Sequence, residues 1–216
     1  IATTFEDASS LVSTSIHRGK MLKRGFLLRF HPCIIDARAQ IRTGRIGAIQ
    51  TIRYSKNAQR QGDNSTHALD ALAIHGIDLA EFLLDGQTPC RISEVIGSHT
   101  SCALTLEYPN QVEIAIDVGW GAEADIAELE VIGQNGRIIV QLQQHGQYEI
   151  VDRQSRIEVV KSKHSPLEAV LLDFLEEDVT SMATSTGSIL RTIKCVEQAR
   201  LQLISSGYPK TRELKR

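Results

Sequence analysis

The chain has 216 residues, a formal net charge of −2 at pH 7, 42% hydrophobic residues and 23% charged residues, which is the composition of an ordinary globular protein. The small net charge gives no general attraction to nucleic acids or acidic membranes, and the apolar runs are too short and too often interrupted by charge to span a bilayer. Because residues 1–20 also lack the basic start and apolar core of a secretory signal, we expect a cytoplasmic protein with no nucleic-acid or membrane partner.

The first part of the chain predicts helices separated by short strands. Thr3 or Thr4 can cap a helix whose first turn carries an acidic pair, and Gly19 can end it. The elements that follow are predicted in this order: a short buried strand at residues 21–28, a helix from Pro32 to Gly44, a half-buried strand at 49–55, an exposed loop at 57–66 and an amphipathic helix at 67–86.

From Arg91 to Lys161 the apolar residues alternate with polar ones, which is the pattern of strands. Seven such stretches, separated by turns such as YPNQ and GQNG, predict an open and mostly antiparallel sheet. Two amphipathic helices, which start at Ser165–Pro166 and at Ser188, close the chain. The order of helices, then strands, then helices predicts an α+β fold with helices on one face of the sheet.

The four cysteines lie far apart and form no CxxC motif or Cys/His cluster; they are Cys33, Cys90, Cys102 and Cys195. Zinc sites and disulfide frameworks need closer, patterned spacing. We therefore expect reduced thiols and no metal site.

His75 lies in the middle of the helix predicted at residues 67–86, with Asp78 one turn after it. Histidine titrates near neutral pH, so it is suited to proton transfer, and a carboxylate one turn away could orient its ring. The alternative is a histidine packed in the core of an ordinary helix, beside a solvated aspartate. The spacing alone leaves both interpretations open.

Four further residues are candidates for a site. Asp70 is either an acid partner of the histidine or a first-turn carboxylate that interacts with the helix dipole, and His67 precedes the same helix. Arg29 lies just before a helix start, where it either helps to hold an anion or is an exposed arginine. Lys56 either binds a polar ligand or keeps a loop solvated. The sequence contains no glycine-rich phosphate loop.

Five stretches, in order, resemble the Gfo/Idh/MocA family of glucose–fructose oxidoreductase and inositol dehydrogenase. They are IATTFEDASSLVSTSIHRGK, LLRFHPCIIDARAQIRTGRIGAIQTIRY, ALAIHGIDLAEFLLDG, LEVIGQNGRIIV and PLEAVLLDFLEED. They are similar, respectively, to the segment after the family's Glu-Lys-Pro motif, its R-F-x-P…G-x-I-G passage, its D-x-x-x-H-x-x-D helix, its I-x-G-x-x-G hairpin and the helix before its last one.

The resemblance implies part of an NAD- or NADP-dependent oxidoreductase that acts on a hydroxyl of a sugar, nucleotide sugar or cyclitol. It implies that residues 1–28 are the last helix and strand of a dinucleotide-binding domain, and that residues 29–216 form a substrate-binding domain that makes a homo-oligomer through its open sheet face. It maps the family's catalytic histidine onto His75, and we expect Asp70 to act with it. In such an enzyme we expect Arg29, Lys56, His67 and Asp78 to bind the substrate.

The chain departs from the family pattern in two places. The family's aspartate lies four residues before the histidine, where this chain has Ala71; Asp70 is one residue earlier and, at about 100° per residue, would point away from His75 on an α-helix. The family's dinucleotide-binding glycines and catalytic lysine would lie before Ile1. We therefore expect no bound cofactor and no turnover by this chain alone.

Two expectations follow from these departures. The alternative function is a non-catalytic binding or oligomerisation module, which Ala71 favours; a Gly-rich start and Glu-Lys-Pro encoded upstream of Ile1 would support the enzyme instead. The apolar strand at residues 21–28 would be an unpaired edge. We expect it to pair with another chain, with a separate N-terminal piece or with the rest of this protein.

Overall fold

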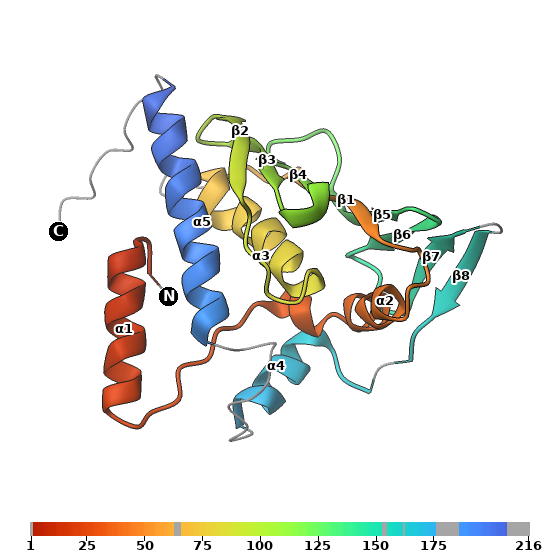
Figure 1. The fold of residues 1–216 in the computed structure, drawn as a ribbon, viewed down its shortest axis with the longest axis horizontal. Helices are drawn as coiled ribbons and strands as arrows, with labels where there is room; N and C mark the ends of the chain where they lie inside the picture. Colours follow the sequence, from red (N-terminus) through yellow and green to blue (C-terminus); the bar gives the residue numbers. More distant parts are fainter. Residues whose placement is uncertain (1, 63–65, 153–154, 162, 176–185, 207–216) are drawn as a thin grey trace.

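A computed structural model describes residues 2–62, 66–152, 155–161, 163–175 and 186–206. Within them the fold is α+β, as predicted (Figure 1). The helices are α1 (Phe5–His17), α2 (Pro32–Arg42), α3 (Ile74–Leu83), α4 (Pro166–Leu175) and α5 (Thr186–Ser205), with short turns at η1 (Leu27–Phe30), η2 (Leu69–Ala73) and η3 (Pro109–Gln111). The strands are β1 (Ile49–Ala58), β2 (Arg91–Gly97), β3 (Ser101–Glu107), β4 (Glu113–Trp120), β5 (Ile126–Gly133), β6 (Gly136–Gln141), β7 (Gln147–Val151) and β8 (Ser155–Val159).

The eight strands form one open sheet in the order β2-β3-β4-β1-β5-β6-β7-β8. Every neighbouring pair is antiparallel except β1 and β4, which run parallel with Thr51 opposite Glu113. The seven strands predicted after Arg91 and the strand predicted at residues 49–55 are confirmed. Because β1 inserts between β4 and β5, it occupies the middle of the sheet although it is first in sequence.

Period-two alternation decides which face of the sheet forms the core. On β4, Ile114, Ile116 and Val118 are buried while Glu113 and Asp117 are exposed. The buried face carries α2, α3 and α5, so the predicted placement of helices on one face is confirmed (Figure 1).

The contact between α3 and β1 depends on a glycine. A Cβ atom at Gly76 would lie 2.6 Å from Cδ1 of Tyr54 and 3.0 Å from Cδ1 of Ile116. The absence of a side chain therefore lets α3 lie directly against β1 and β4, and it fixes the height of this helix above the sheet.

Residues 21–28 do not form the predicted strand. The segment has no regular structure until the 3₁₀ turn η1 begins at Leu27. The physical reason is that Lys23 and Arg24 interrupt the apolar run. Both side chains are buried and form ion pairs: Lys23 Nζ lies 3.3 Å from Asp173 of α4, and Arg24 contacts Asp78 of α3. The segment therefore packs on the rest of this chain, which was one of the three expected outcomes.

The helical predictions near the two ends are confirmed where the structure describes them. Helix α1 is capped by Thr4, whose side chain accepts a hydrogen bond from the Asp7 amide, and it lies beside α5 (Figure 1). Helices α4 and α5 begin near the predicted Ser165–Pro166 and Ser188. The predicted end of the first of these helices, within residues 176–183, lies outside the described residues.

No helix in the described ranges is both long enough and apolar enough to cross a membrane. All four cysteines are free thiols: Cys33, Cys102 and Cys195 are buried and Cys90 is exposed.

Candidate functional site

A cavity of about 290 Å³ opens between the start of α3, the segment at residues 24–26 and helix α5. Arg24 and Phe26 line it on one side, and Ile189 of α5 lines it on another. Two of the residues predicted for catalysis, Asp70 and His75, both line this cavity. The structure therefore brings this predicted pair to one site.

A π-helical turn lies between Ala68 and Ile74 and sets the direction of Asp70 relative to His75. The sequence predicted one continuous α-helix, but residues Leu69–Ala73 form the π-turn η2, in which the Ile74 amide donates to the Leu69 carbonyl five residues back. The wider turn places residues five apart on the same side, whereas α-helical geometry would turn Asp70 away from His75. The expectation that Asp70 points away applied to an α-helix that includes Asp70, whereas α3 begins after it, at Ile74.

His75 is the titratable residue of this cavity whose side chain has the fewest hydrogen bonds and ion pairs. Its ring makes no hydrogen bond or ion pair with any described residue, and it meets the Phe26 ring edge to face with centroids 5.8 Å apart. Burial, and then the positive charge of Lys56, lowers the pKa of His75 below 6.5. At pH 7 the imidazole is therefore neutral and able to accept a proton.

Asp70 is held by a residue that the sequence did not suggest. Arg200 of α5 forms an ion pair with Oδ1 of Asp70, and it also donates to the Thr3 carbonyl at 3.0 Å. The second carboxylate oxygen of Asp70 accepts no hydrogen bond within the described part of the chain. That oxygen is free to accept one from a ligand. Nothing in the local sequence pattern points to Arg200, because it lies 130 residues away from Asp70.

Two of the predicted substrate-binding residues lie near the cavity without lining it. Lys56 is on the helix-covered face of β1, two residues beyond the buried Tyr54, and its charge acts on His75. His67 is buried; its Nδ1 accepts a hydrogen bond of 3.0 Å from the Leu69 amide, so it caps the π-turn. Burial lowers the pKa of His67. His67 therefore supports the turn that carries Asp70.

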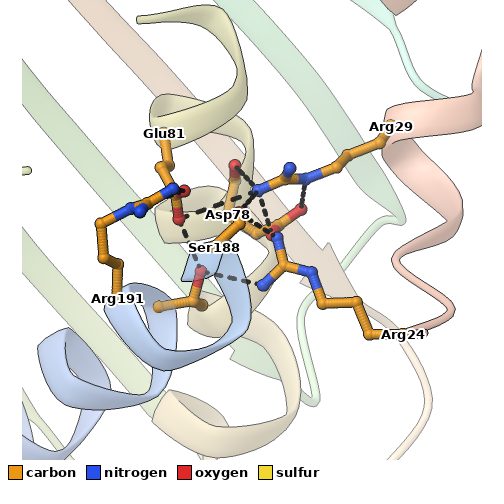
Figure 2. Close-up of polar contacts among 7 residues, drawn as sticks. Arg24, Arg29, Asp78, Glu81, Ser188 and Arg191 are labelled. Atoms are coloured by element: carbon orange, nitrogen blue, oxygen red, sulfur yellow. Dashed lines mark hydrogen bonds and ion pairs between the residues drawn. The ribbon is translucent and has the colours of Figure 1, made fainter. Parts of the chain in front are cut away.

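The other two, Arg29 and Asp78, lie inside the protein and not at a ligand surface (Figure 2). Only 2% of Arg29 and 1% of Asp78 is exposed. The Arg29 guanidinium makes a two-pronged contact with the carboxylate: Nε lies 2.9 Å from Oδ2 and Nη2 lies 2.8 Å from Oδ1. Their side chains bind each other inside the fold and are not exposed to a substrate.

This buried cluster extends into α5 (Figure 2). Arg24 also contacts Asp78, and it donates to the Ser188 hydroxyl at 2.8 Å. Arg191 binds Glu81, with Nη2 2.7 Å from Oε1. We call the set formed by Arg24, Arg29, Asp78, Glu81, Ser188, Arg191 and Thr192 the buried arginine cluster. The sequence pattern pointed to only two of its members, Arg29 and Asp78, because the others come from positions far apart in the chain.

Neither a metal nor a dinucleotide fits the described residues. No group of three histidine, cysteine, aspartate or glutamate side chains in this part of the chain is placed to bind a metal ion. The cavity of about 290 Å³ is at the lower limit for a small ligand, and it contains no glycine-rich strand-to-helix turn of the kind that holds a pyrophosphate. The NAD or NADP that the sequence resemblance implies has no site among these residues.

Comparison with protein families gives a match that covers most of the sheet together with helices α2 and α3. Residues 34–139 match the GFO/IDH/MocA C-terminal domain. The resemblance found in the sequence motifs is therefore confirmed by the match of residues 34–139 to the C-terminal domain of the Gfo/Idh/MocA family. At the sequence level, no curated protein matches the chain.

Solved structures share the fold at low sequence identity. An aldose-aldose oxidoreductase from Caulobacter crescentus superposes with a TM-score of 0.80 at 15% identity, covering 95% of this chain and 68% of that one. The 3-ketoreductase KijD10 from Actinomadura kijaniata, in complex with TDP-benzene and NADP, has a TM-score of 0.80 at 17% identity (92% and 66%). UDP-N-acetylglucosamine 3-dehydrogenase from Acidithiobacillus ferrooxidans has a TM-score of 0.76 at 16% identity (93% and 67%). The chain thus spans about two thirds of each of these structures.

Proposed function

We propose that this chain is the substrate-binding part of an NAD(P)-dependent oxidoreductase that acts on a hydroxyl of a sugar, nucleotide sugar or cyclitol. The observation that carries this proposal is the cavity that both Asp70 and His75 line. The similar structures, which include a nucleotide-sugar dehydrogenase and a ketoreductase, support the substrate class. Turnover would need a dinucleotide-binding unit in addition to the residues described here.

The cavity residues are suited to the proton part of such a reaction. Oxidation of a hydroxyl to a carbonyl removes a proton from oxygen and a hydride from carbon, and His75 can take only the first. Its lowered pKa keeps the imidazole neutral at pH 7, so a ring nitrogen can accept the hydroxyl proton. Asp70, fixed by Arg200, offers an open carboxylate oxygen to a neighbouring hydroxyl of the ligand.

We expect His75→Gln, in the full encoded polypeptide, to lower kcat for NAD(P)-dependent sugar oxidation by about 10²- to 10⁴-fold, because general-base catalysis contributes effects of that size. Steady-state kinetics with glucose, myo-inositol and UDP-N-acetylglucosamine would measure it. The matched control is His17→Gln, which changes an exposed histidine at the end of α1 and should leave kcat unchanged. Activity within threefold of wild type in His75→Gln would remove the proton-transfer role.

The competing function is a non-catalytic binding or oligomerisation module. The segment at residues 21–28 supports it, because this segment packs within the same chain. Lys23 forms an ion pair with α4, and Arg24 forms one with α3. The experiment above separates the two functions: a full polypeptide that binds sugars but never reduces NAD(P) would establish the module.

We also propose that the chain forms a homo-oligomer through the sheet face that carries no helix. One cross-strand row on this face runs through Arg53, Glu130, Ile139, Glu149 and Ile157, so apolar and paired charged side chains alternate across the strands. Ile157 is 57% exposed. Such a mixed surface suits a self-complementary interface, in which the same patch meets its copy.

Light scattering after size exclusion should therefore give at least twice the mass of one polypeptide. Ile139→Arg replaces an apolar side chain in the middle of this row by a long charged one, whose burial in an interface costs free energy, and should raise the dissociation constant by tenfold or more. Ile16→Arg, at an isoleucine of α1 that is 70% exposed, is the control and should leave the mass unchanged. A monomeric wild type would refute the interface.

A further inference from the structure

The His75 ring lacks the hydrogen bond that usually orients a proton-accepting imidazole. In such a histidine one ring nitrogen normally bonds to a carboxylate or a carbonyl, and that bond fixes the tautomer and the direction of the ring. No hydrogen bond or ion pair joins the His75 ring to the part of the chain that the structure describes. The packing around the ring therefore decides its orientation.

The aromatic ring packed against His75 is that of Phe26. The two rings meet edge to face, with their centroids 5.8 Å apart and an angle of 89° between their planes. This arrangement is favoured for an aromatic pair, because the positive edge of one ring lies against the negative face of the other. Both residues line the cavity. The contact therefore favours one orientation of the imidazole at the cavity wall.

Arg24 in turn holds Phe26. The guanidinium carbon of Arg24 lies 4.1 Å from the centre of the Phe26 ring, which is within the range of a cation–π interaction. The same guanidinium binds Asp78 of α3 and donates to the Ser188 hydroxyl of α5 at 2.8 Å (Figure 2). Because the guanidinium is bonded to two helices, the position of the ring stacked on it is set by the buried arginine cluster.

These contacts join the segment at residues 24–26 to α3 at two points. Arg24 pairs with Asp78, and Phe26 meets His75, which lies three residues earlier on the helix. Residues three apart on an α-helix lie on the same face, so both contacts fall on one side of α3. Two contacts fix both the position and the direction of the segment relative to the helix, whereas a single contact would leave the direction open.

We propose that Phe26 is a positioning residue of this site, which holds the His75 imidazole in the orientation from which a ring nitrogen takes the hydroxyl proton of the substrate. The inference rests on the proposed function, because it assumes that His75 accepts this proton. Phe26 itself exchanges no proton. Its role is to replace, by packing, the hydrogen bond that the imidazole lacks.

The first test observes the wild-type full polypeptide by nuclear magnetic resonance. Labelled histidine and phenylalanine rings should show a nuclear Overhauser effect between His75 and Phe26, because the edge of one ring touches the face of the other. The signals of the two rings are identified by their absence from the spectra of His75→Gln and Phe26→Tyr. Absence of this effect in the wild type would overturn the proposal without any measurement of activity.

The second test is kinetic. Phe26→Leu keeps an apolar side chain but removes the ring, and it should lower kcat for NAD(P)-dependent sugar oxidation by about 10- to 100-fold, the effect of a misplaced reacting group. The values of kcat and kcat/KM should fall by the same factor, because the orientation of His75 acts in the transition state. Rates are expressed per folded enzyme, measured by circular dichroism, so that a loss of stability is not counted as a loss of kcat.

Phe26→Tyr and Phe5→Leu complete the experiment. Phe26→Tyr keeps the ring and should retain most of the wild-type kcat. Phe5→Leu is the matched control, because Phe5 of α1 also lies under a cation, with Lys194 Nζ 5.9 Å from its ring centre, but does not line the cavity. It should leave kcat and KM unchanged.

The outcomes separate this inference from the proposed function. Wild-type kcat in Phe26→Leu, together with lost activity in His75→Gln, refutes the positioning role and leaves the proposed function intact. A Phe26→Tyr variant as slow as Phe26→Leu also refutes it, since the ring is then present without the rate. Wild-type activity in His75→Gln removes the proton-transfer role and this inference with it.

Discussion

Replacing Asp78 by asparagine should lower the free energy of unfolding by about 3–5 kcal/mol, the usual cost of removing one partner from a buried ion pair. The carboxylate of Asp78 is the common acceptor of Arg24 and Arg29, and it is 1% exposed. The amide keeps the volume but removes the negative charge that both guanidinium groups share. Because the cluster joins residues 24–29 to α3 and α5, we expect the loss to appear as global unfolding and not as local fraying.

Urea unfolding of the full polypeptide, followed by circular dichroism, would measure this loss. The matched control is Glu107→Gln, which breaks an arginine–carboxylate pair of similar geometry on the protein surface, with Arg91 Nη2 2.5 Å from Glu107. Exposed pairs of this kind contribute little to stability, so the urea midpoint of the control should stay at the wild-type value. A loss below about 1 kcal/mol in Asp78→Asn would show that the buried arginine cluster does not hold the fold together.

Acid should destabilise the fold through His31, which is 1% exposed at the start of α2. Burial, and then the nearby His145, lowers the pKa of His31 from 6.5 to about 4. Between these two values the unfolded state binds more protons than the folded state, so this contribution to stability is present above pH 6.5 and is lost as the pH falls toward 4. At about 1.4 kcal/mol per pH unit, the full loss is about 3 kcal/mol.

The variant His31→Phe isolates this contribution, because it keeps an aromatic ring against His145 and cannot take up a proton. Urea unfolding at pH 7 and at pH 4 should show a smaller drop in stability for the variant than for the wild type, by about 3 kcal/mol. Other groups that titrate in this range cancel in the comparison. His17→Phe, at an exposed site on α1, should retain the wild-type drop. Parallel pH profiles for His31→Phe and wild type would exclude His31 as the source.

Much of the fold is determined by patterns among residues that are close together in the sequence. The period-two alternation after Arg91 predicts the strands that are observed, because each strand only needs one apolar face. Capping residues such as Thr4 and Pro166 predict the starts of their helices for an equally local reason. The exception is the segment at residues 21–28. Its apolar pattern predicted a strand, but Lys23 and Arg24 form ion pairs with helices that are distant in sequence, and no strand forms.

The site depends more on tertiary structure. The sequence alone determined that His75 lies on an amphipathic helix of a Gfo/Idh/MocA-type domain, because helical periodicity and the family motifs are visible in consecutive residues. Only the tertiary structure decided that Asp70 shares the cavity with His75 and that Asp78 is buried, since the first needs a π-turn and the second needs Arg24 and Arg29, 54 and 49 residues away. Hydrophobic periodicity acts between neighbouring turns, whereas the pairing of buried charges depends on which distant segments the fold brings into contact.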